Sequence, residues 1–308
     1  MRTDQLEEVS IMGHAGLGLV AAIAAALIGA GWQVVTRFGV TTTVSPYDLA
    51  LIRYAIPAVV LAPILIRHGL VPKGVHPGLL AVMVLGGGLP FGVLVMQGAQ
   101  FAPAAHIAVL IPGTMPIFVS GLAIAFLGET LTRRVGLGFG LLVAGVICIG
   151  WEAVMTMGRE TVFGDLLLIT AAFLWGAYSV AFRRSGLDAW HGAAVICVWS
   201  TVLVVPIWLL LGSSGFSATP PAHLAMQVFW QGILAGAVGM WVYGYAVQSI
   251  GASRAASLSA LVPGFSLMGG WLFLGEGPSW LSGCGVGLTI LGVAVANSQP
   301  RQRVRSSP

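Results

Sequence analysis

Charged residues are scarce in this chain. Asp, Glu, Lys and Arg make up 8% of the 308 residues, whereas 57% are hydrophobic. Because a soluble domain carries roughly 25% charged residues, this composition excludes a water-soluble fold and predicts a chain surrounded by lipid. The net charge of +4 is therefore read as a signal of membrane orientation, and no nucleic-acid partner is expected.

Cysteine and nucleotide-binding motifs are also rare. Cys148, Cys197 and Cys284 lie in apolar runs without C-x-x-C spacing, so we expect packing residues and no disulfide, metal or cofactor. The sequence contains no G-x-x-x-x-G-K-[ST] motif, which excludes a P-loop ATPase.

No acidic residue lies near the middle of an apolar run, and the remaining carboxylates are scattered: Asp48, Glu152, Glu160, Asp165 and Asp188. A membrane enzyme would need such groups clustered at the membrane surface, so the chain is expected not to be an enzyme. Carboxylate relays are a common proton path in pumps. Their absence favours exchange or facilitated export, and leaves proton coupling open.

Ten apolar runs approach or exceed the roughly 20 residues that a helix needs to cross a bilayer. They cover 14–37, 48–67, 77–98, 103–127, 132–151, 164–183, 190–211, 224–247, 251–274 and 279–297. The sequence therefore predicts an all-α integral membrane protein of ten transmembrane helices. The other segments are an N-terminal stretch at 1–13, a linker at 152–163 and a basic tail at 298–308.

Most of the 14 basic residues fall at one end of the predicted helices. With a cytoplasmic N-terminus, ten of them face the cytoplasm, as the positive-inside rule favours. These are Arg2, Arg67, Lys73, Arg133, Arg134, Arg183, Arg184, Arg301, Arg303 and Arg305. We therefore expect a multi-pass inner-membrane protein with both termini in the cytoplasm and an external 152–163 linker.

The chain matches itself at an ungapped offset of 147 residues. PIFVSGLAIAFLGE at 116–129 pairs with PGFSLMGGWLFLGE at 263–276, and the same offset pairs Arg37 with Arg184. The match divides the chain into two halves, 14–151 and 164–297.

Each half contains five predicted helices, and five is an odd number. The second half must therefore be inverted relative to the first. Inverted repeats of this kind recur in secondary transporters, in which two packings of the same parts exchange the side that is open.

These residues resemble the EamA-type transporters of the drug/metabolite transporter superfamily. The resemblance rests on two P-x₁₂-E segments that close as LGE, on the glycine-rich helix after each, and on Arg53 early in the second run. It implies export or exchange of small polar metabolites, such as amino acids, by alternating access. It also implies a central cavity lined by helices 1, 3, 4, 6, 8 and 9, with helices 5 and 10 at the periphery. Two alternatives remain, a lipid or lipid-linked sugar flippase of the same fold and a membrane enzyme.

Polar and aromatic side chains inside the runs are the candidates for substrate binding, because a buried polar group in lipid needs a partner. They are Trp32, Gln33, Gln97, His106, Thr114, Tyr178, Ser179, Trp241, Tyr243 and Arg254. Hydrogen bonding between helices is the alternative role for the polar members, and interfacial anchoring for Arg254. His106 is also able to titrate near neutral pH.

Five further residues are candidates for hinges or gates: Pro116, Pro263, Glu129, Glu276 and Arg53. A proline inside a helix frees a carbonyl group that must meet protein, water or ligand, although a plain kink is the alternative. The two glutamates alternatively cap turns, and Arg53 alternatively anchors its helix at the interface.

Gly136, Gly140, Gly283 and Gly287 repeat at a spacing of four in the fifth and tenth runs. Small residues at this spacing allow close helix contact. They either join these two helices within one chain or form a homodimer.

Overall fold

A computed structural model describes the chain except for residues 1, 129–131, 212–214, 251–257 and 298–308. The described residues are helical and contain no strand. The helices are α1 (Arg2–Val40), α2 (Pro46–His68), α3 (Pro77–Gly87), α4 (Leu89–Phe101), α5 (Ala104–Leu127), α6 (Arg133–Glu152), η1 (Ala153–Met157), α7 (Arg159–Ser185), α8 (Ala189–Leu211), α9 (Gly215–Ala218), α10 (Pro221–Gln227), η2 (Val228–Val238), α11 (Gly239–Ile250), η3 (Ser259–Leu261), α13 (Val262–Leu274) and α14 (Trp280–Asn297). The segments η1 and η2 are π-helical, and η3 is a 3₁₀ turn.

Within this described part of the chain, seven helices are long and apolar enough to cross a bilayer, and two shorter apolar helices cover Val262–Leu274 and Trp280–Ala296. Large apolar side chains on their outer faces are exposed, as a lipid environment requires. The all-α, multi-pass membrane class is therefore confirmed. The number of ten stays a prediction: among the described residues the eighth run divides into α10, η2 and α11, and the ninth is described only from Leu258 onward.

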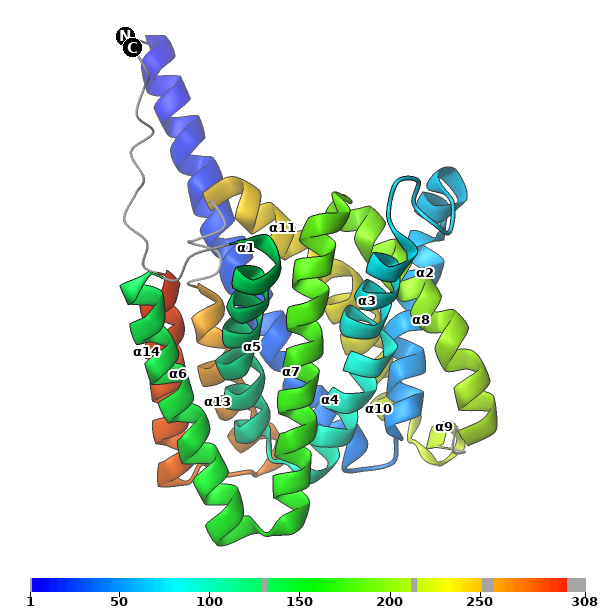
Figure 1. The fold of residues 1–308 in the computed structure, drawn as a ribbon, viewed down its shortest axis with the longest axis vertical. Coiled ribbons are helices and arrows are strands. Elements are labelled where there is room, and N and C mark those ends of the chain that lie inside the picture. The colour runs from blue at the N-terminus through cyan, green and yellow to red at the C-terminus, as the bar shows by residue number, and fades with distance from the viewer. Residues whose placement is uncertain (1, 129–131, 212–214, 251–257, 298–308) are drawn as a thin grey trace.

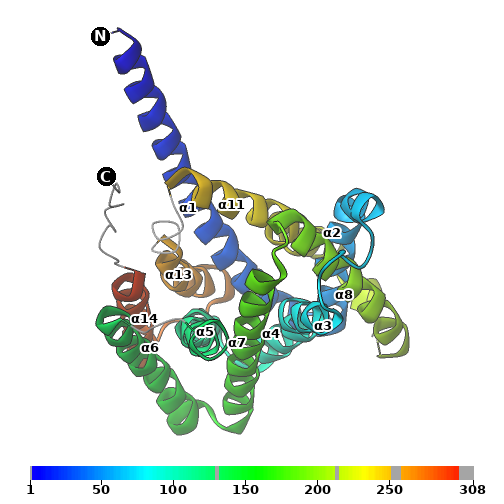
Figure 2. The same ribbon diagram turned by 45° about the horizontal axis from the view of Figure 1, so that its top comes forward.

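The helices form two lateral pairs around a central group. Figures 1 and 2 show α6 beside α14 at one edge of the bundle and α2 beside α8 at the other. Between them, α7 packs against α3, α4 and α5, while α1 contacts α11, α13 and η2. The last helix of each predicted half, α6 in the first and α14 in the second, thus lies at the periphery, and the two are side by side.

The contact between α6 and α14 depends on glycines other than those predicted. A Cβ atom on Gly138 would lie 2.7 Å from the Gly292 oxygen, and one on Gly145 would lie 2.8 Å from the Gly285 oxygen. Gly140, Gly283 and Gly287 instead face open space. The contact between α6 and α14 lies within one chain and uses other glycines. A homodimer through Gly136, Gly140, Gly283 and Gly287 therefore stays a prediction.

The third predicted run is a broken helix, which the sequence reading missed. It divides at Gly88 (φ −104°, ψ −139°) into α3 and α4. The Tyr54 hydroxyl donates to the Gly88 oxygen at 2.6 Å, and the Leu89 N–H donates to Ser200 Oγ at 3.0 Å. The Leu89 N–H, freed by the break, is thus paired with a side chain of α8, as lipid requires. Tyr54 of α2 adds a second donor to the Gly88 oxygen, which also accepts from the Gly92 N–H.

Candidate functional site

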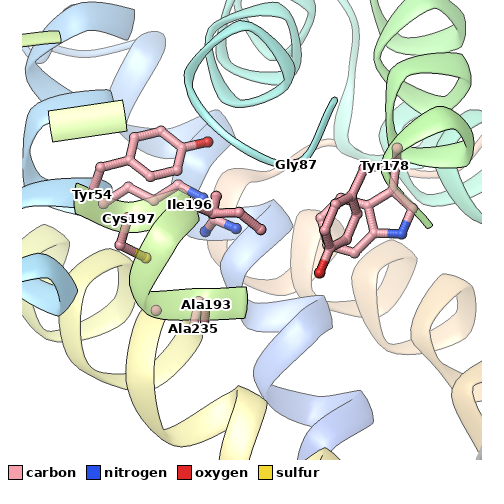
Figure 3. Close-up of a pocket in the computed structure, with 10 residues that line it drawn as sticks. Tyr54, Gly87, Tyr178, Ala193, Ile196, Cys197 and Ala235 are labelled. Carbon is pink, nitrogen blue, oxygen red and sulfur yellow. The ribbon is translucent and has the colours of Figure 1, made fainter. Parts of the chain in front are cut away.

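A cavity of about 130 Å³ lies among α2, α3, α7, α8 and η2, close to the break between α3 and α4. It is lined by Arg53, Tyr54, Gly87, Trp175, Tyr178, Ala193, Ile196, Cys197, Ala235 and Gly236. Figure 3 shows Tyr178 on the opposite side of this space from Tyr54 and Cys197. The volume is small beside the roughly 300–1,000 Å³ of pockets for drug-sized ligands. The Arg53 cavity therefore suits a small ligand.

Arg53 brings a positive charge to this cavity. Its Nη1 atom is buried and has no hydrogen-bond partner among the described residues. Its guanidinium carbon lies 4.4 Å from the centre of the Trp32 ring and 6.0 Å from that of Tyr54. Aromatic faces attract a cation without using its N–H donors, so Nη1 remains available to an acceptor such as a carboxylate.

Trp32 is held in place beneath that cation. Its side chain is 9% exposed, and Nε1 donates to the Gln231 oxygen Oε1 at 2.8 Å. Gln231 in turn donates from Nε2 to Thr36 Oγ1 at 2.8 Å. This chain of hydrogen bonds joins α1 to the π-helical η2, and it fixes the ring face that Arg53 covers.

Aromatic rings form the wall of the Arg53 cavity that α7 supplies. Trp175 and Tyr178 meet edge to face, with ring centres 5.0 Å apart, and Phe91 of α4 lies 4.9 Å from Trp175. Rings with a polar group can bind both apolar and polar parts of a ligand. The cavity thus combines one cation with an aromatic wall.

A second constellation, the Arg37–Glu276 clamp, ties several helices together at one end of the bundle. Arg37 Nε donates to Glu276 Oε1 at 2.7 Å, and its Nη1 donates to the carbonyl oxygens of Ala99 and Gln100 at 2.8 and 2.9 Å. The other Glu276 oxygen accepts from the Ala104 N–H at 2.7 Å. The end of α1, the end of α4, the start of α5 and the loop after α13 are therefore joined through two side chains.

A third constellation corrects the expectation that the carboxylates are scattered. His106 Nδ1 lies 2.9 Å from an oxygen of Asp165, and Glu152 Oε2 lies 4.0 Å from His106 Nε2. Ser282 Oγ donates to the same Glu152 oxygen at 2.7 Å. These four residues, the His106 cluster, come from α5, α6, α7 and α14.

Several other predicted substrate residues do not line the Arg53 cavity. Gln33 accepts from Ser266 at 2.7 Å, and the hydroxyls of Thr114 and Ser179 donate to carbonyls four residues back, those of Leu110 and Trp175. Gln97 is half-buried on α4. Gln33 thus makes a hydrogen bond between helices, whereas Thr114 and Ser179 bond within their own helices.

The remaining predictions differ in outcome. Pro116 lies inside α5 as expected, but Pro263 is in the first turn of α13, where its missing N–H is not needed; it is not a mid-helix kink in the described part of its run. Glu129 and Arg254 lie outside the described residues, as do the side chains of Trp241 and Tyr243.

Helices 1, 3, 4, 6, 8 and 9 were expected to line the cavity. Among the described residues, α2 and α8 line it, whereas the first, fourth and ninth predicted runs do not. Tyr54 and Cys197 were absent from the predicted site. The run of glycines before Leu89-Pro90 in the sequence was the signal that would have drawn attention to this region.

A larger, mostly apolar cavity of about 500 Å³ lies beside α1. It is lined by Leu27, Ala30, Gly31, Val34, Val35, Phe38, His223, Met226, Trp230, Phe265, Gly269, Phe273 and Leu274. Phe273 is 80% exposed, so this cavity borders the lipid-facing surface and suits an acyl chain.

The chain resembles transporters from several organisms. It is 29% identical over 84% of its length to a "Probable terminal-alkyne amino-acid exporter" of Streptantibioticus cattleyicolor, covering 87% of that protein. It is 28% identical over 63% of its length to the "Uncharacterized transporter YoaV" of Bacillus subtilis, covering 67% of that protein. A crystal structure with 19% identity shares the fold with a TM-score of 0.62, over 91% of this chain and 96% of that one.

These relatives point to a transporter rather than an enzyme. The sequence profile of the EamA-like transporter family matches the chain twice, at residues 16–151 and 162–298. The two matches account for most of the chain and place one copy in each half of the predicted repeat. The chain therefore belongs to the EamA-like transporter family, within the drug/metabolite type of transporter.

Proposed function

We propose that this chain is a secondary transporter that exports or exchanges small carboxylate-bearing metabolites, amino acids or related compounds, by alternating access. The observation that carries the proposal is the unpartnered Nη1 donor of Arg53, buried at a small cavity with an aromatic wall. A buried donor without a partner is unfavourable, and a substrate carboxylate supplies the missing acceptor with opposite charge. The amino-acid exporter among the relatives supports this class of substrate.

The aromatic wall supports a substrate that also carries an ammonium group. Trp175 and Tyr178 present rings on α7, and no Asp or Glu among the described residues lines the Arg53 cavity. An ammonium group would therefore interact with ring faces and the Tyr178 hydroxyl. This arrangement favours small amino acids over dicationic or polycationic compounds.

Alternating access requires that one end closes while the other is open. We assign the closed end to the Arg37–Glu276 clamp, because it joins four segments from both halves of the chain. Glu276 thus keeps its predicted gating role, with Arg37 as a partner that the sequence reading did not select. The proposal includes ten membrane crossings in two inverted halves, an inner-membrane location and cytoplasmic termini.

The experiment is uptake of a labelled metabolite panel, led by amino acids, into proteoliposomes. Arg53→Gln should weaken substrate affinity roughly thirtyfold or more, because removing one partner of a buried charge pair costs about 2–5 kcal/mol. Arg53→Lys should recover part of it, since a lysine keeps the charge but not the planar donor fork. Arg67→Gln, an exposed arginine at the other end of α2, is the matched control and should transport normally.

The alternatives give different results. Equal affinity in wild type and Arg53→Gln would remove Arg53 from the site. Lack of uptake of every soluble compound, together with movement of a labelled lipid between leaflets, would favour the flippase, for which the apolar cavity beside α1 provides an opening toward lipid.

A further inference from the structure

The His106 cluster is almost wholly excluded from solvent. His106, Asp165, Glu152 and Ser282 are 0%, 5%, 2% and 3% exposed. His106 Nδ1 lies 2.9 and 3.1 Å from the two Asp165 oxygens, so an N–H at this position donates to the carboxylate. None of these residues lines the Arg53 cavity.

The other nitrogen of the His106 ring lacks a partner. Nε2 is buried without a hydrogen bond, and it faces a Glu152 oxygen at 4.0 Å. When Nδ1 carries the ring hydrogen, the Nε2 lone pair points toward an anion. A proton placed on Nε2 or on the Glu152 carboxyl converts this repulsive contact into an attractive one.

The net negative charge of the cluster also favours the binding of a proton. Within the described part of the chain, neither Asp165 nor Glu152 has a Lys or Arg partner. With a neutral His106 the cluster holds two uncompensated negative charges, which are costly away from water. One proton halves that charge. No set of three or more side chains suited to a metal ion is found among the described residues.

The elements packed against the start of α5 bring no other charge into contact with His106. From α7 comes Asp165 and from α6 comes Glu152, while α4 and α13 carry no titratable side chain. Arg37 of α1 and Glu276 after α13 pair with each other. The further titratable groups toward this end of α6, α7 and α14 are the thiols of Cys148 and Cys284 and the exposed Arg159 and Glu160.

We propose that His106, Asp165 and Glu152 form a proton-binding site, and that the proton bound there is the ion coupled to transport. Proton binding stands on the cluster alone, whereas the coupling rests on the proposed transport function. The sequence favoured exchange or facilitated export and left proton coupling open, and this proposal takes up the open alternative.

The position of the cluster explains how a proton would affect the gate. His106 lies two residues after Ala104, whose N–H is held by Glu276 in the clamp. The Glu276 bond to the Ala104 N–H and the contacts of His106 with its cluster both act on the first turn of α5. A change of charge at His106 alters the attraction of α5 for α6 and α7 at the point where the clamp holds it to α1 and α13.

Proton binding is tested by infrared difference spectroscopy of the purified protein in lipid as the pH is varied. We expect a protonated-carboxyl band that titrates in wild type and is lost in Glu152→Gln or Asp165→Asn. Glu160→Gln, an exposed carboxylate on α7, should keep it. An unchanged band in both cluster variants would overturn the proposal.

A milder substitution keeps the test decisive if the cluster variants do not fold. Ser282→Ala removes the hydroxyl that donates to Glu152 and thereby destabilises the charged carboxylate. The protonated-carboxyl band should then be stronger than in wild type at the same pH. No change would show that Glu152 does not bind the proton.

Coupling is tested with a metabolite that the uptake panel identifies. Glu152→Gln should lose uptake driven by a pH gradient but retain exchange of labelled for unlabelled metabolite. Gradient-driven uptake equal to that of wild type would overturn the coupling. If no metabolite is taken up by wild type, the proposed function fails, while the infrared result still decides proton binding.

Discussion

At the scale of single residues, Arg53 shows how a cation is kept inside a lipid-embedded fold. An arginine at the centre of a membrane helix costs roughly 2.5–3.5 kcal/mol on insertion scales. The Trp32 face at 4.4 Å from the guanidinium carbon offsets part of this cost, since a desolvated cation–π contact contributes about 2 kcal/mol. In the proposed function, a substrate carboxylate lowers the remaining free-energy cost of burying Arg53.

The Trp32 ring and its N–H make separable contributions. Trp32→Phe keeps an aromatic face under Arg53 but leaves the buried Gln231 oxygen without a donor. We expect a loss of about 1–3 kcal/mol in the free energy of unfolding, with uptake largely retained. Trp32→Leu should lose both stability and uptake.

The check is thermal unfolding in detergent alongside uptake into proteoliposomes. Equal uptake in the Phe and Leu variants would show that the aromatic face does not position Arg53. Equal melting of wild type and Trp32→Phe would remove the role assigned to the hydrogen bond with Gln231.

Residue type alone was enough to select three residues at the Arg53 cavity. Arg53, Trp32 and Tyr178 were selected because charge and aromatic rings are rare or costly inside apolar runs, and all three meet at the Arg53 cavity or beneath its cation. Asp165 and Glu152 were not selected because the carboxylates are scattered along the sequence, with Glu152 in the predicted linker and Asp165 at the start of a run. Only the packing of α6 and α7 against α5 shows that these ends meet around His106.

At the scale of elements, the break between α3 and α4 determines the shape of the cavity. Gly87 lines the cavity, and Gly88 carries the change in backbone direction. A Cβ atom on Gly88 would lie 2.2 Å from Ser200 Oγ and 2.3 Å from the Val84 oxygen. The backbone oxygen cannot move away without disturbing α3.

Gly88→Ala should therefore destabilise the protein by about 1–3 kcal/mol, as overpacking of a tight interior does. Uptake should fall as well, because the displaced backbone borders the Arg53 cavity. Gly140→Ala, at a position with open space around it, is the matched control. Melting temperatures and uptake of both variants check this, and equal behaviour would contradict the role of Gly88.

The extent of the helices was predictable where apolar runs are continuous and bounded by caps. The predicted run 132–151 corresponds to α6, where Thr132 accepts from the Val135 N–H as an N-cap. Hydropathy did not reveal the break at Gly88, because both sides of it are equally apolar. It also did not reveal η2, where Gln231, like Gln227 just before it, hydrogen-bonds to α1.

At the scale of the whole molecule, the Arg37–Glu276 clamp connects the two halves of the chain. Arg37 and its carbonyl partners belong to the first half, and Glu276 belongs to the second. Their repeat partners are Arg184 and Glu129. Arg184 is exposed, and Glu129 lies outside the described residues.

Glu276→Gln should loosen this end of the bundle, because the ion pair is replaced by a neutral contact. A cysteine placed at Ala104, 1% exposed beside Glu276, should then react faster with a membrane-impermeant maleimide. The measurement uses a background without Cys148, Cys197 and Cys284. Glu160→Gln is the control, and equal labelling rates in both variants would contradict a gating role.

The clamp also has a consequence for the speed of the transport cycle. Its charge-assisted bonds, each worth about 1.5–3 kcal/mol, must separate every time this end opens. Because each 1.4 kcal/mol changes a rate tenfold, the gating role proposed for the clamp would make the separation of these bonds a slow step of the transport cycle. A chain with a weaker pair at these two positions would cycle faster, but it would maintain a smaller concentration gradient of its substrate.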